Sequence, residues 1–232
     1  MKQRDLLPEL MDDPGLNRQD HISALRGLQR INRWTNMAGL AWQPIEQLAC
    51  QHPGKTLRVL DIATGSADLP VQIWQRAKRA SIHLEIEACD VSEQAVAFAR
   101  ENCRRAGAPI KLFTLDVLHD LIPAAYDIVL CSTFLHHLTH DQTVLVLDKM
   151  ARAASRRVVA VDLVRGRLNW LQVWLACRLL SRSRIVHYDG PQSIRASYTL
   201  GEVNEIVRRI SLANYRITSH WPCRFVLVGD IA

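Results

Sequence analysis

The sequence predicts an α/β fold with a seven-stranded, mostly parallel sheet that has an antiparallel edge strand, together with an N-terminal helical segment and a helical lid insertion. From residue 57 onward, short β-branched apolar runs alternate with helix-like segments, which is typical of successive βαβ units. Two late runs lie only a few residues apart, on either side of Pro222, and predict an antiparallel hairpin. Residues 1–55 and 163–198 do not follow this repeat.

The predicted strands are short and rich in apolar residues. The fourth strand is apolar on both faces, as expected for a strand in the middle of a parallel sheet. The seven strands are expected at residues 57–62, 84–89, 110–115, 126–131, 157–161, 215–219 and 224–228.

Local signals mark the ends of the helices between these strands. Pro70 lies near the start of one helix, where its missing N–H group has no cost. Ser92 can cap the next helix, which is expected to stop at Gly107. Thr199 and Glu202 form a T-x-x-E capping box at the start of the last helix.

The two segments outside the repeat are expected to cover one site. Residues 1–55 would form an N-terminal helical cap, with a helix from Ile22 to about Gly39, and residues 56–232 would form the main domain. The lid insertion, residues 163–198, is far longer than the usual connection of about 2–6 residues, and such insertions are usually functional. Four of the six tryptophans lie in these segments, which predicts an aromatic-lined lid: Trp34, Trp42, Trp170 and Trp174.

Within the lid insertion, residues 168–180 predict a helix that is apolar on most of its circumference. No acidic residue occurs between Asp162 and Asp189. Five arginines flank the apolar body: Arg165, Arg167, Arg178, Arg182 and Arg184. A helix of this composition packs against its domain, covers a lipophilic substrate, or rests on an anionic membrane surface, and these alternatives stay open.

Composition and charge restrict the choice of partner and compartment. Apolar residues make up 48% of the chain and the formal charge is +6, which is ordinary for a folded chain. The basic excess is spread along the chain, so a nucleic-acid partner is not favoured. The six cysteines lie at least 14 residues apart, which predicts reduced thiols and no metal site. No apolar run near the N-terminus has the length of a signal peptide, so a cytoplasmic location is expected.

The strongest functional signal is the turn that follows the first strand. Asp61 closes that strand, and a turn of small residues with Gly65 at its centre leads into a helix. Ligands of open α/β sheets bind at this carboxyl edge. Dinucleotide-binding turns have the pattern G-x-G-x-x-G, whereas this turn has Ala63 and Ala67 with Gly65 as its one glycine. The turn therefore favours a nucleoside without a pyrophosphate.

Two further acids follow neighbouring strands. Asp90 closes the second strand, where a carboxylate can accept both hydroxyls of a ribose. Asp116 follows the third strand and could accept a hydrogen bond from an adenine amino group. Each acid alone is typical of a cap or turn, but three in register favour a nucleoside site.

These residues resemble the motifs of the class I S-adenosylmethionine-dependent methyltransferases over roughly residues 57–230. The matching stretches are Asp61-x-Ala63-x-Gly65-x-Ala67, Asp90-Val91-Ser92, Leu115-Asp116-Val117, and Tyr126–Leu130 ahead of Leu135-His136-His137-Leu138. That family commonly has D/E-x-G-x-G-x-G in the first motif, so the two alanines are mild departures that keep the central glycine. The resemblance implies a Rossmann-like sheet and S-adenosylmethionine as the cofactor.

The resemblance also implies positions for the parts of the cofactor. Asp61 and Gly65 would face the methionine part, Asp90 the ribose and Asp116 the adenine. The predicted cofactor-binding set also contains Ala63, Val91, Val117 and Ser132. The chain looks most like the small-molecule branch that includes the ubiquinone and menaquinone biosynthesis methyltransferases, and residues 8–14 are similar to bacterial methyltransferases found beside polyketide synthases.

Methyl transfer from a sulfonium needs an aligned nucleophile and, for a phenol, a base. An ordinary histidine side chain suits this proton transfer. His136 and His137 follow the fourth strand beside the predicted methyl, and His136 is preferred because it lies closer to the strand end. His187 is a third candidate, since the Gly190-Pro191 turn could aim it inward; a core or solvated role is the alternative for each histidine.

The sequence therefore predicts an S-adenosylmethionine-dependent methyltransferase that acts on a small, largely apolar acceptor, aromatic or polyketide-like, most readily at oxygen. The partner expected is a small lipophilic substrate, with peripheral membrane contact as a further expectation, and the sequence gives no oligomeric state. An RNA methyltransferase is the main alternative because of the arginines. A nicotinamide-dependent oxidoreductase is disfavoured by the missing glycines.

Overall fold

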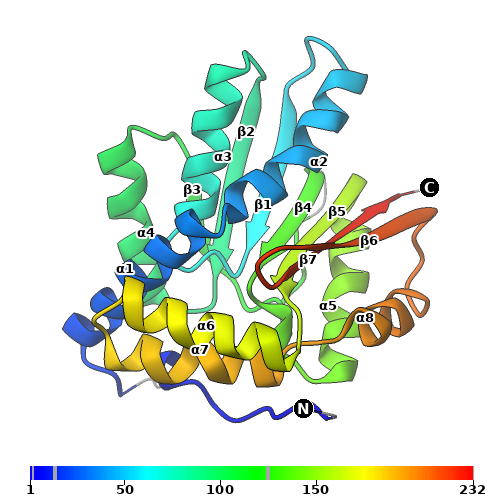
Figure 1. Ribbon diagram of the computed structural model, residues 1–232. Coiled ribbons are helices and arrows are strands. Elements are labelled where there is room, and N and C mark those ends of the chain that lie inside the picture. The colour runs from blue at the N-terminus through cyan, green and yellow to red at the C-terminus, as the bar shows by residue number, and fades with distance from the viewer. Residues whose placement is uncertain (2, 13–14, 124–125, 232) are drawn as a thin grey trace.

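The computed structural model describes residues 1, 3–12, 15–123 and 126–231 (Figure 1). Its centre is a seven-stranded sheet in the order β3-β2-β1-β4-β5-β7-β6, in which β1 to β5 are parallel and β6 and β7 are antiparallel to their neighbours. The predicted fold class is confirmed. The strands are β1 (Leu57–Ile62), β2 (Leu84–Asp90), β3 (Lys111–Thr114), β4 (Tyr126–Ser132), β5 (Ala154–Leu163), β6 (Asn214–His220) and β7 (Arg224–Asp230).

Helices cover both faces of this sheet (Figure 1). Because side chains alternate along a strand, Leu60 and Val129 belong to one core and Val59 and Ile128 to the other. The first core is completed by α5 (His140–Ala153) and α8 (Leu200–Val207), and the second by α2 (Met37–Gln51) and α3 (Asp68–Arg79). The helix α4 (Glu93–Ala106) packs beside α3.

The predicted helix ends are confirmed where a side chain or a glycine sets them. Ser92 accepts a hydrogen bond from the backbone of α4, and Gly107 ends that helix with a φ of 64°. The capping box of Thr199 and Glu202 is complete at the start of α8.

The prediction of one helix from Ile22 to Gly39 is wrong. The chain forms α1 (Arg18–Trp34), breaks, and continues as α2. Thr35 donates its hydroxyl hydrogen to the carbonyl of Ile31, and Asn36 takes a left-handed conformation with a φ of 51°. Trp34, the last residue of α1, is exposed.

The lid insertion forms two antiparallel helices, α6 (Arg167–Leu180) and α7 (Arg184–Ala196), which lie against α1 (Figure 1). The prediction of a turn at Gly190-Pro191 is wrong, because both residues lie inside α7. Gly190 faces the Sγ atom of Cys177 on α6, where a Cβ atom would collide. The glycine therefore serves close helix packing.

The N-terminal strap, residues 3–12, runs along α7 and includes the 3₁₀ turn η1 (Leu10–Asp12) (Figure 1). Arg4 donates to the carbonyls of Ala196 and Leu138, at 2.6 and 2.9 Å. The buried Asp189 accepts from the N–H groups of Leu10 and Met11. Residues 13 and 14 of the N-terminal stretch similar to polyketide-associated methyltransferases lie outside the described residues.

Among the described residues, no helix combines the length and apolar character needed to cross a membrane.

Candidate active site

A cavity of about 1030 Å³ lies at the carboxyl ends of β1, β2 and β4. One wall comes from the turns after these strands, and α1 and α6 form the opposite wall with mostly apolar side chains. A pocket for one drug-sized ligand has about 300–1000 Å³, so this cavity can hold a cofactor and an acceptor together. Seven predicted site residues line it: Ala63, Gly65, Asp90, Val91, Ser132, His136 and His137.

The turn between β1 and α3 places three small residues in left-handed conformations. The φ angles of Ala63, Gly65 and Ala67 are 52°, 55° and 56°. These three residues are the small-residue positions of the first motif, which occur at every second residue. The backbone therefore takes a left-handed conformation typical of glycine at all three, even where the residue is alanine. A Cβ atom added to Gly65 would meet nothing within 4 Å. Gly65 therefore leaves open the cavity space that a ligand can fill.

Asp90 holds this turn while it lines the cavity. One carboxylate oxygen accepts from the N–H of Gly65 at 2.8 Å, and the other accepts from the N–H of Ser92 at 2.9 Å. Each carboxylate oxygen can accept more than one hydrogen bond. Asp90 therefore has the capacity for the predicted ribose contact in addition to its structural role.

Asp61 lies beneath the turn, where it is completely buried. Its Oδ2 atom accepts from the hydroxyl of Thr64 at 2.6 Å, while Oδ1 has no hydrogen-bond partner among the described residues. Burial, together with the charges of Asp68 and Asp90, raises the pKa of Asp61 to about 8, although the Thr64 hydrogen bond opposes this shift. A cation bound beside Asp61 would favour its charged form.

Two cavity residues, Asp68 and Arg224, were not predicted from the sequence. Arg224 at the start of β7 is buried and donates to Asn32 at 3.0 Å, but its Nη1 atom has no partner among the described residues. The Oδ2 atom of Asp68 is likewise buried and unpartnered. An unpaired guanidinium N–H and unpaired carboxylate oxygens match the carboxylate and ammonium groups of an amino acid. No local motif marks Arg224, because it reaches the cavity only through the pairing of β7 with β5.

Asp116 and Val117 do not line the cavity in this structure. The carboxylate of Asp116 accepts from the N–H of Leu118 and contacts Nδ1 of His119 at 2.8 Å. The His119 hydrogen bond is the main cause of its lowered pKa. Val117 is buried in the core. The predicted adenine contact of Asp116 stays a prediction, since the carboxylate is engaged in its own turn.

His136 is the best-positioned base in the cavity. It is buried in the short helix η2 (Leu135–His137), and its Nδ1 atom lies 2.7 Å from the carboxylate of Asp162 at the end of β5. The same carboxylate accepts from the N–H groups of Phe134 and Leu163. Burial raises the pKa of Asp162, but the His136 charge and these hydrogen bonds outweigh it and hold the pKa below its usual range. An ionised Asp162 keeps the proton of His136 on Nδ1 and leaves Nε2 free to accept one.

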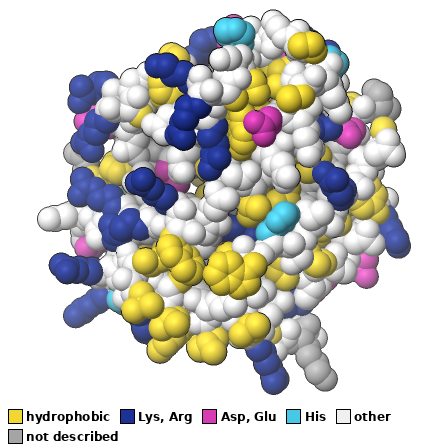
Figure 2. Space-filling model, turned by 45° about the horizontal axis from the view of Figure 1, so that its top comes forward, with side chains coloured by type: hydrophobic (Ala, Val, Ile, Leu, Met, Phe, Trp, Pro, Cys, Tyr) yellow, Lys and Arg dark blue, Asp and Glu magenta, His cyan; other side chains and the backbone are white. Residues whose placement is uncertain are grey.

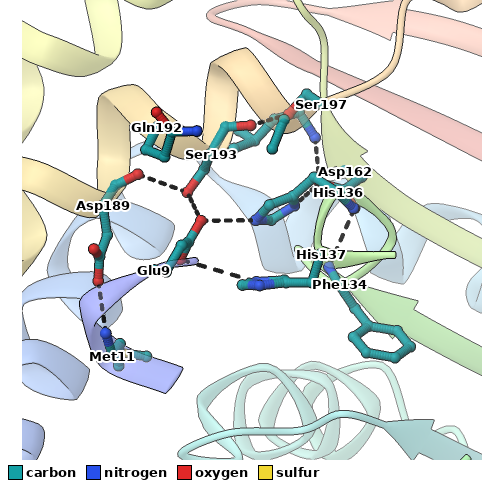
Figure 3. Close-up of polar contacts among 12 residues, drawn as sticks. Glu9, Met11, Phe134, His136, His137, Asp162, Asp189, Gln192, Ser193 and Ser197 are labelled. Carbon is teal, nitrogen blue, oxygen red and sulfur yellow. Dashed lines mark hydrogen bonds and ion pairs between the residues drawn. The ribbon is translucent and has the colours of Figure 1, made fainter. Parts of the chain in front are cut away.

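Glu9 from the N-terminal strap meets this histidine pair (Figure 3). Its Oε1 atom lies 3.7 Å from Nε2 of His136 and accepts from the hydroxyl of Ser193 at 2.5 Å. Its Oε2 atom lies 4.0 Å from Nε2 of His137. Glu9, His136 and His137 thus offer ligand atoms within 4.8 Å of one another, which a proton or a divalent cation could bridge. No sequence motif indicated this group, because Glu9 is more than a hundred residues away from the histidines.

The structure places His187 away from this group. Its Nε2 atom lies 2.8 Å from the carbonyl oxygen of Ser181, and the side chain is not part of the cavity wall. The catalytic role predicted for His187 depended on a turn that would aim it inward, and the helix α7 directs it instead to the α6–α7 connection.

Comparisons with known proteins agree with the geometry of the cavity. Residues 59–157 match the family model of a methyltransferase domain. This match agrees with the resemblance of these residues to the class I S-adenosylmethionine-dependent methyltransferases. No curated protein matches the sequence.

Several solved methyltransferase structures share the fold. A magnesium protoporphyrin IX methyltransferase from Synechocystis with bound SAH is 18% identical, with a TM-score of 0.58, over 96% of this chain and 91% of that one. A methyltransferase from Aquifex aeolicus is 17% identical, with a TM-score of 0.61, over 94% of this chain and 100% of that one. An O-methyltransferase structure from Nostoc punctiforme is 19% identical, with a TM-score of 0.65, over 98% of this chain but 64% of that one.

The methyltransferase cavity fits S-adenosylmethionine. Arg224 would bind the carboxylate of its methionine part, and the unpaired oxygen of Asp68 would face the ammonium group. Asp61, which the resemblance also assigns to the methionine part, lies beneath the turn and is not part of the cavity wall. Gly65 leaves room for the ligand, and Asp90 lines the same cavity, while its ribose contact stays a prediction. The buried atoms without partners therefore have a physical explanation in the bound state.

Proposed function

We propose that this methyltransferase methylates a hydroxyl oxygen of a small, largely apolar acceptor with an aromatic or polyketide-like ring. The observation that carries the proposal is the buried Asp162–His136 pair, which opens onto an apolar cavity beside the cofactor position. Side chains of α1 and α6, among them Leu25, Leu28 and Val173, supply the apolar wall.

The residues of the chain would act on the acceptor in two ways. S-adenosylmethionine supplies a methyl group on a positively charged sulfur. The apolar wall aligns the acceptor ring, so its oxygen meets that methyl group in line. His136 takes the acceptor proton on Nε2, and the resulting positive charge lies between the carboxylates of Asp162 and Glu9. Glu9 is a positioning residue in this scheme.

A matched pair of acceptors tests the methylated atom. We expect methyl transfer to 4-pentylphenol and none to 4-pentylaniline, because a base that removes a proton is useful for the phenol and not for the neutral amine. Mass spectrometry of the products from labelled S-adenosylmethionine distinguishes the two. Transfer to the aniline alone, or to neither compound nor any longer-chain phenol, contradicts O-methylation.

The base assignment predicts the effect of removing His136. His136→Ala should lower the single-turnover rate by about 10²–10⁴-fold with little change in the affinity for SAH. A nitrophenol that is already ionised at the assay pH should restore most of this rate, because its proton is already gone. Equal losses for ionised and neutral phenols would show that His136 is only structural. His137→Ala is the matched control, with a smaller effect expected.

A bound metal is the alternative to a proton between Glu9 and the histidines. If His136 acts as a base, excess EDTA should leave the transfer rate unchanged, and the purified protein should hold no stoichiometric metal by mass spectrometry. Loss of activity with EDTA, restored by added zinc or manganese, would contradict base catalysis by His136. It would indicate that a metal ion activates the acceptor oxygen.

A further inference from the structure

The outer face of α6 is apolar and exposed. Leu168, Leu171, Leu175 and Leu179 are spaced by three or four residues, so they share one side of the helix. Their exposed fractions range from 50% to 73%. Cys177, on the other side, is the one residue of α6 that is fully buried among the described residues. Most helices of a folded domain bury their leucines, so this face is expected to have a partner.

This leucine face is continuous with the mouth of the active-site cavity. Leu175 and Leu179 are exposed and also line the cavity. Trp34 and Trp221, 57% and 75% exposed, line the same cavity with ring centroids 6.2 Å apart. The apolar surface around this opening therefore leads directly to the position predicted for the acceptor.

Arginines border the leucine face. A groove between α1 and the end of α6 is lined by Arg26, Arg30, Arg178 and Arg182, with Asp20 as the one acid in its wall. Arg30 donates to the carbonyl of Leu180 at 2.7 Å, and the Arg178 guanidinium lies 4.0 Å from the Trp174 ring centroid. These contacts hold positive charge beside the leucines. Figure 2 shows hydrophobic side chains gathered on the lower part of one face of the molecule, with Lys and Arg side chains near them.

We propose that this surface, the leucine face of α6 with the arginine groove and the two tryptophans, docks on an anionic lipid bilayer. Leucines on one side of a helix can enter the boundary between head groups and acyl chains, while arginines bind lipid phosphates and tryptophans lie at the same level. A second copy of the chain fits less well, because symmetric contact would bring two arginine-lined grooves together. Docking would turn the cavity mouth toward the bilayer, so a lipophilic acceptor could enter without crossing water.

Vesicle sedimentation tests the docking. We expect the full chain to bind vesicles of three parts phosphatidylcholine to one part phosphatidylglycerol at least about tenfold more tightly than vesicles of phosphatidylcholine alone, and to lose most of this preference in 0.5 M NaCl. Equal binding to both vesicles, or no binding to either, overturns the proposal.

Two pairs of substitutions separate the apolar and the charged contributions. Leu168→Asp with Leu171→Asp should lower vesicle binding at least about tenfold, and neither residue lines the cavity. Arg178→Glu with Arg182→Glu should produce a similar loss. The control Leu121→Asp changes an exposed leucine elsewhere and should bind like the wild type.

A second control distinguishes the effect of the groove arginines from the effect of the net charge of the protein. Calorimetry and sedimentation equilibrium then test whether each variant is folded and whether the protein is a dimer. Arg79→Glu, at the end of α3, with Arg208→Glu, just after α8, makes the same change in net charge elsewhere and should leave most of the binding intact. Calorimetry with SAH should give the wild-type affinity for every variant, which shows that each is folded. Equal losses in the control and test variants overturn the proposal. So does sedimentation equilibrium that shows a dimer which Leu171→Asp dissociates, because the face would then join two copies.

Discussion

At the scale of single residues, the cofactor end of the cavity combines features that are unfavourable in the free protein. Asp61, Asp68 and Arg224 each have a buried polar atom without a partner among the described residues. An unpaired buried group costs about 1–3 kcal/mol. Ala63 and Ala67 add left-handed backbone conformations that alanine adopts unfavourably. Such costs are typical of sites whose geometry is completed by a ligand.

The raised pKa of Asp61 predicts a pH-dependent stability of the cofactor-free protein. The folded state keeps the Asp61 proton up to about pH 8, whereas the unfolded chain releases it near pH 4. Stability from this group is therefore present at low pH and is lost as the pH rises between these values, by at most about 1.4 kcal/mol per pH unit. Asp61→Asn should remove this dependence, so the variant gains stability relative to the wild type between pH 5.5 and pH 8.

Urea unfolding at several pH values measures this difference. The same variant should bind SAH more weakly, because an amide cannot supply the negative charge that Asp61 would place beneath the amino-acid part of the ligand. Parallel pH profiles for Asp61→Asn and the wild type would show that Asp61 is ionised in the free protein.

The left-handed backbone conformation of Ala63 predicts that glycine is more favourable than alanine at this position. Ala63→Gly should stabilise the free protein by about 0.5–1 kcal/mol, since relief of the left-handed cost exceeds the added flexibility of the unfolded chain. Ala97→Gly, at an exposed position inside α4, is the matched control and should destabilise by a similar amount. Urea unfolding decides the sign, and destabilisation by both changes would contradict the strain at Ala63.

At the scale of elements, the sequence predicted what local patterns determine. The strands, the cap at Ser92 and the stop at Gly107 follow from short-range periodicity and side-chain chemistry. The break at Thr35 and Asn36 was missed because neither residue is a strong helix breaker. The Gly190-Pro191 pair resembles a turn in the sequence, but Gly190 is needed for close contact with Cys177 on a different helix. A local sequence pattern does not predict contacts between residues that are far apart in the chain.

The same limit applied to the site. The acids at strand ends were predictable, because the carboxyl ends of parallel strands meet at one edge. Asp162 also lies at the end of a strand, but its hydrogen bond to His136 depends on the tertiary structure and has no local signal in the sequence. Glu9 and Arg224 reach the cavity from the two ends of the chain, and no spacing rule connects them.

One buried side chain of α7, Asp189, accepts two hydrogen bonds from the end of the N-terminal strap. Asp189→Ala removes the acceptor of the Leu10 and Met11 N–H groups, and charged hydrogen bonds of this kind contribute about 1.5–3 kcal/mol. The strap should open at least about tenfold more often, so trypsin should cleave after Arg4 correspondingly faster. Tyr188→Ala, at the exposed neighbouring position, is the control. Equal cleavage rates in the two variants would mean that Asp189 does not hold the strap.

At the scale of the whole molecule, a buried sheet carries a cover whose helix α6 is mostly not buried. Six of the seven residues of β4 are buried, whereas α6 buries Cys177 alone. The cavity lies between these layers, and its floor belongs to the sheet while its roof belongs to α1 and α6. Ligand-binding covers are generally drawn from the less stable parts of a fold.

This division predicts the order in which ligands protect the backbone from hydrogen exchange. In the free protein, amides of β1, β4 and β5 should exchange slowest, and amides of α6 fastest among the long helices, because few of its side chains anchor it. SAH should protect the turn at residues 63–68, because most of its residues line the cavity at the cofactor end. An apolar phenol added afterwards should protect α1 and α6 while leaving the turn unchanged, since it fills the other half of the cavity. Mass-resolved exchange separates these peptides. If SAH alone protected α6 as strongly as the turn, the cover would respond to the cofactor, and the apolar half of the cavity would not be the acceptor site.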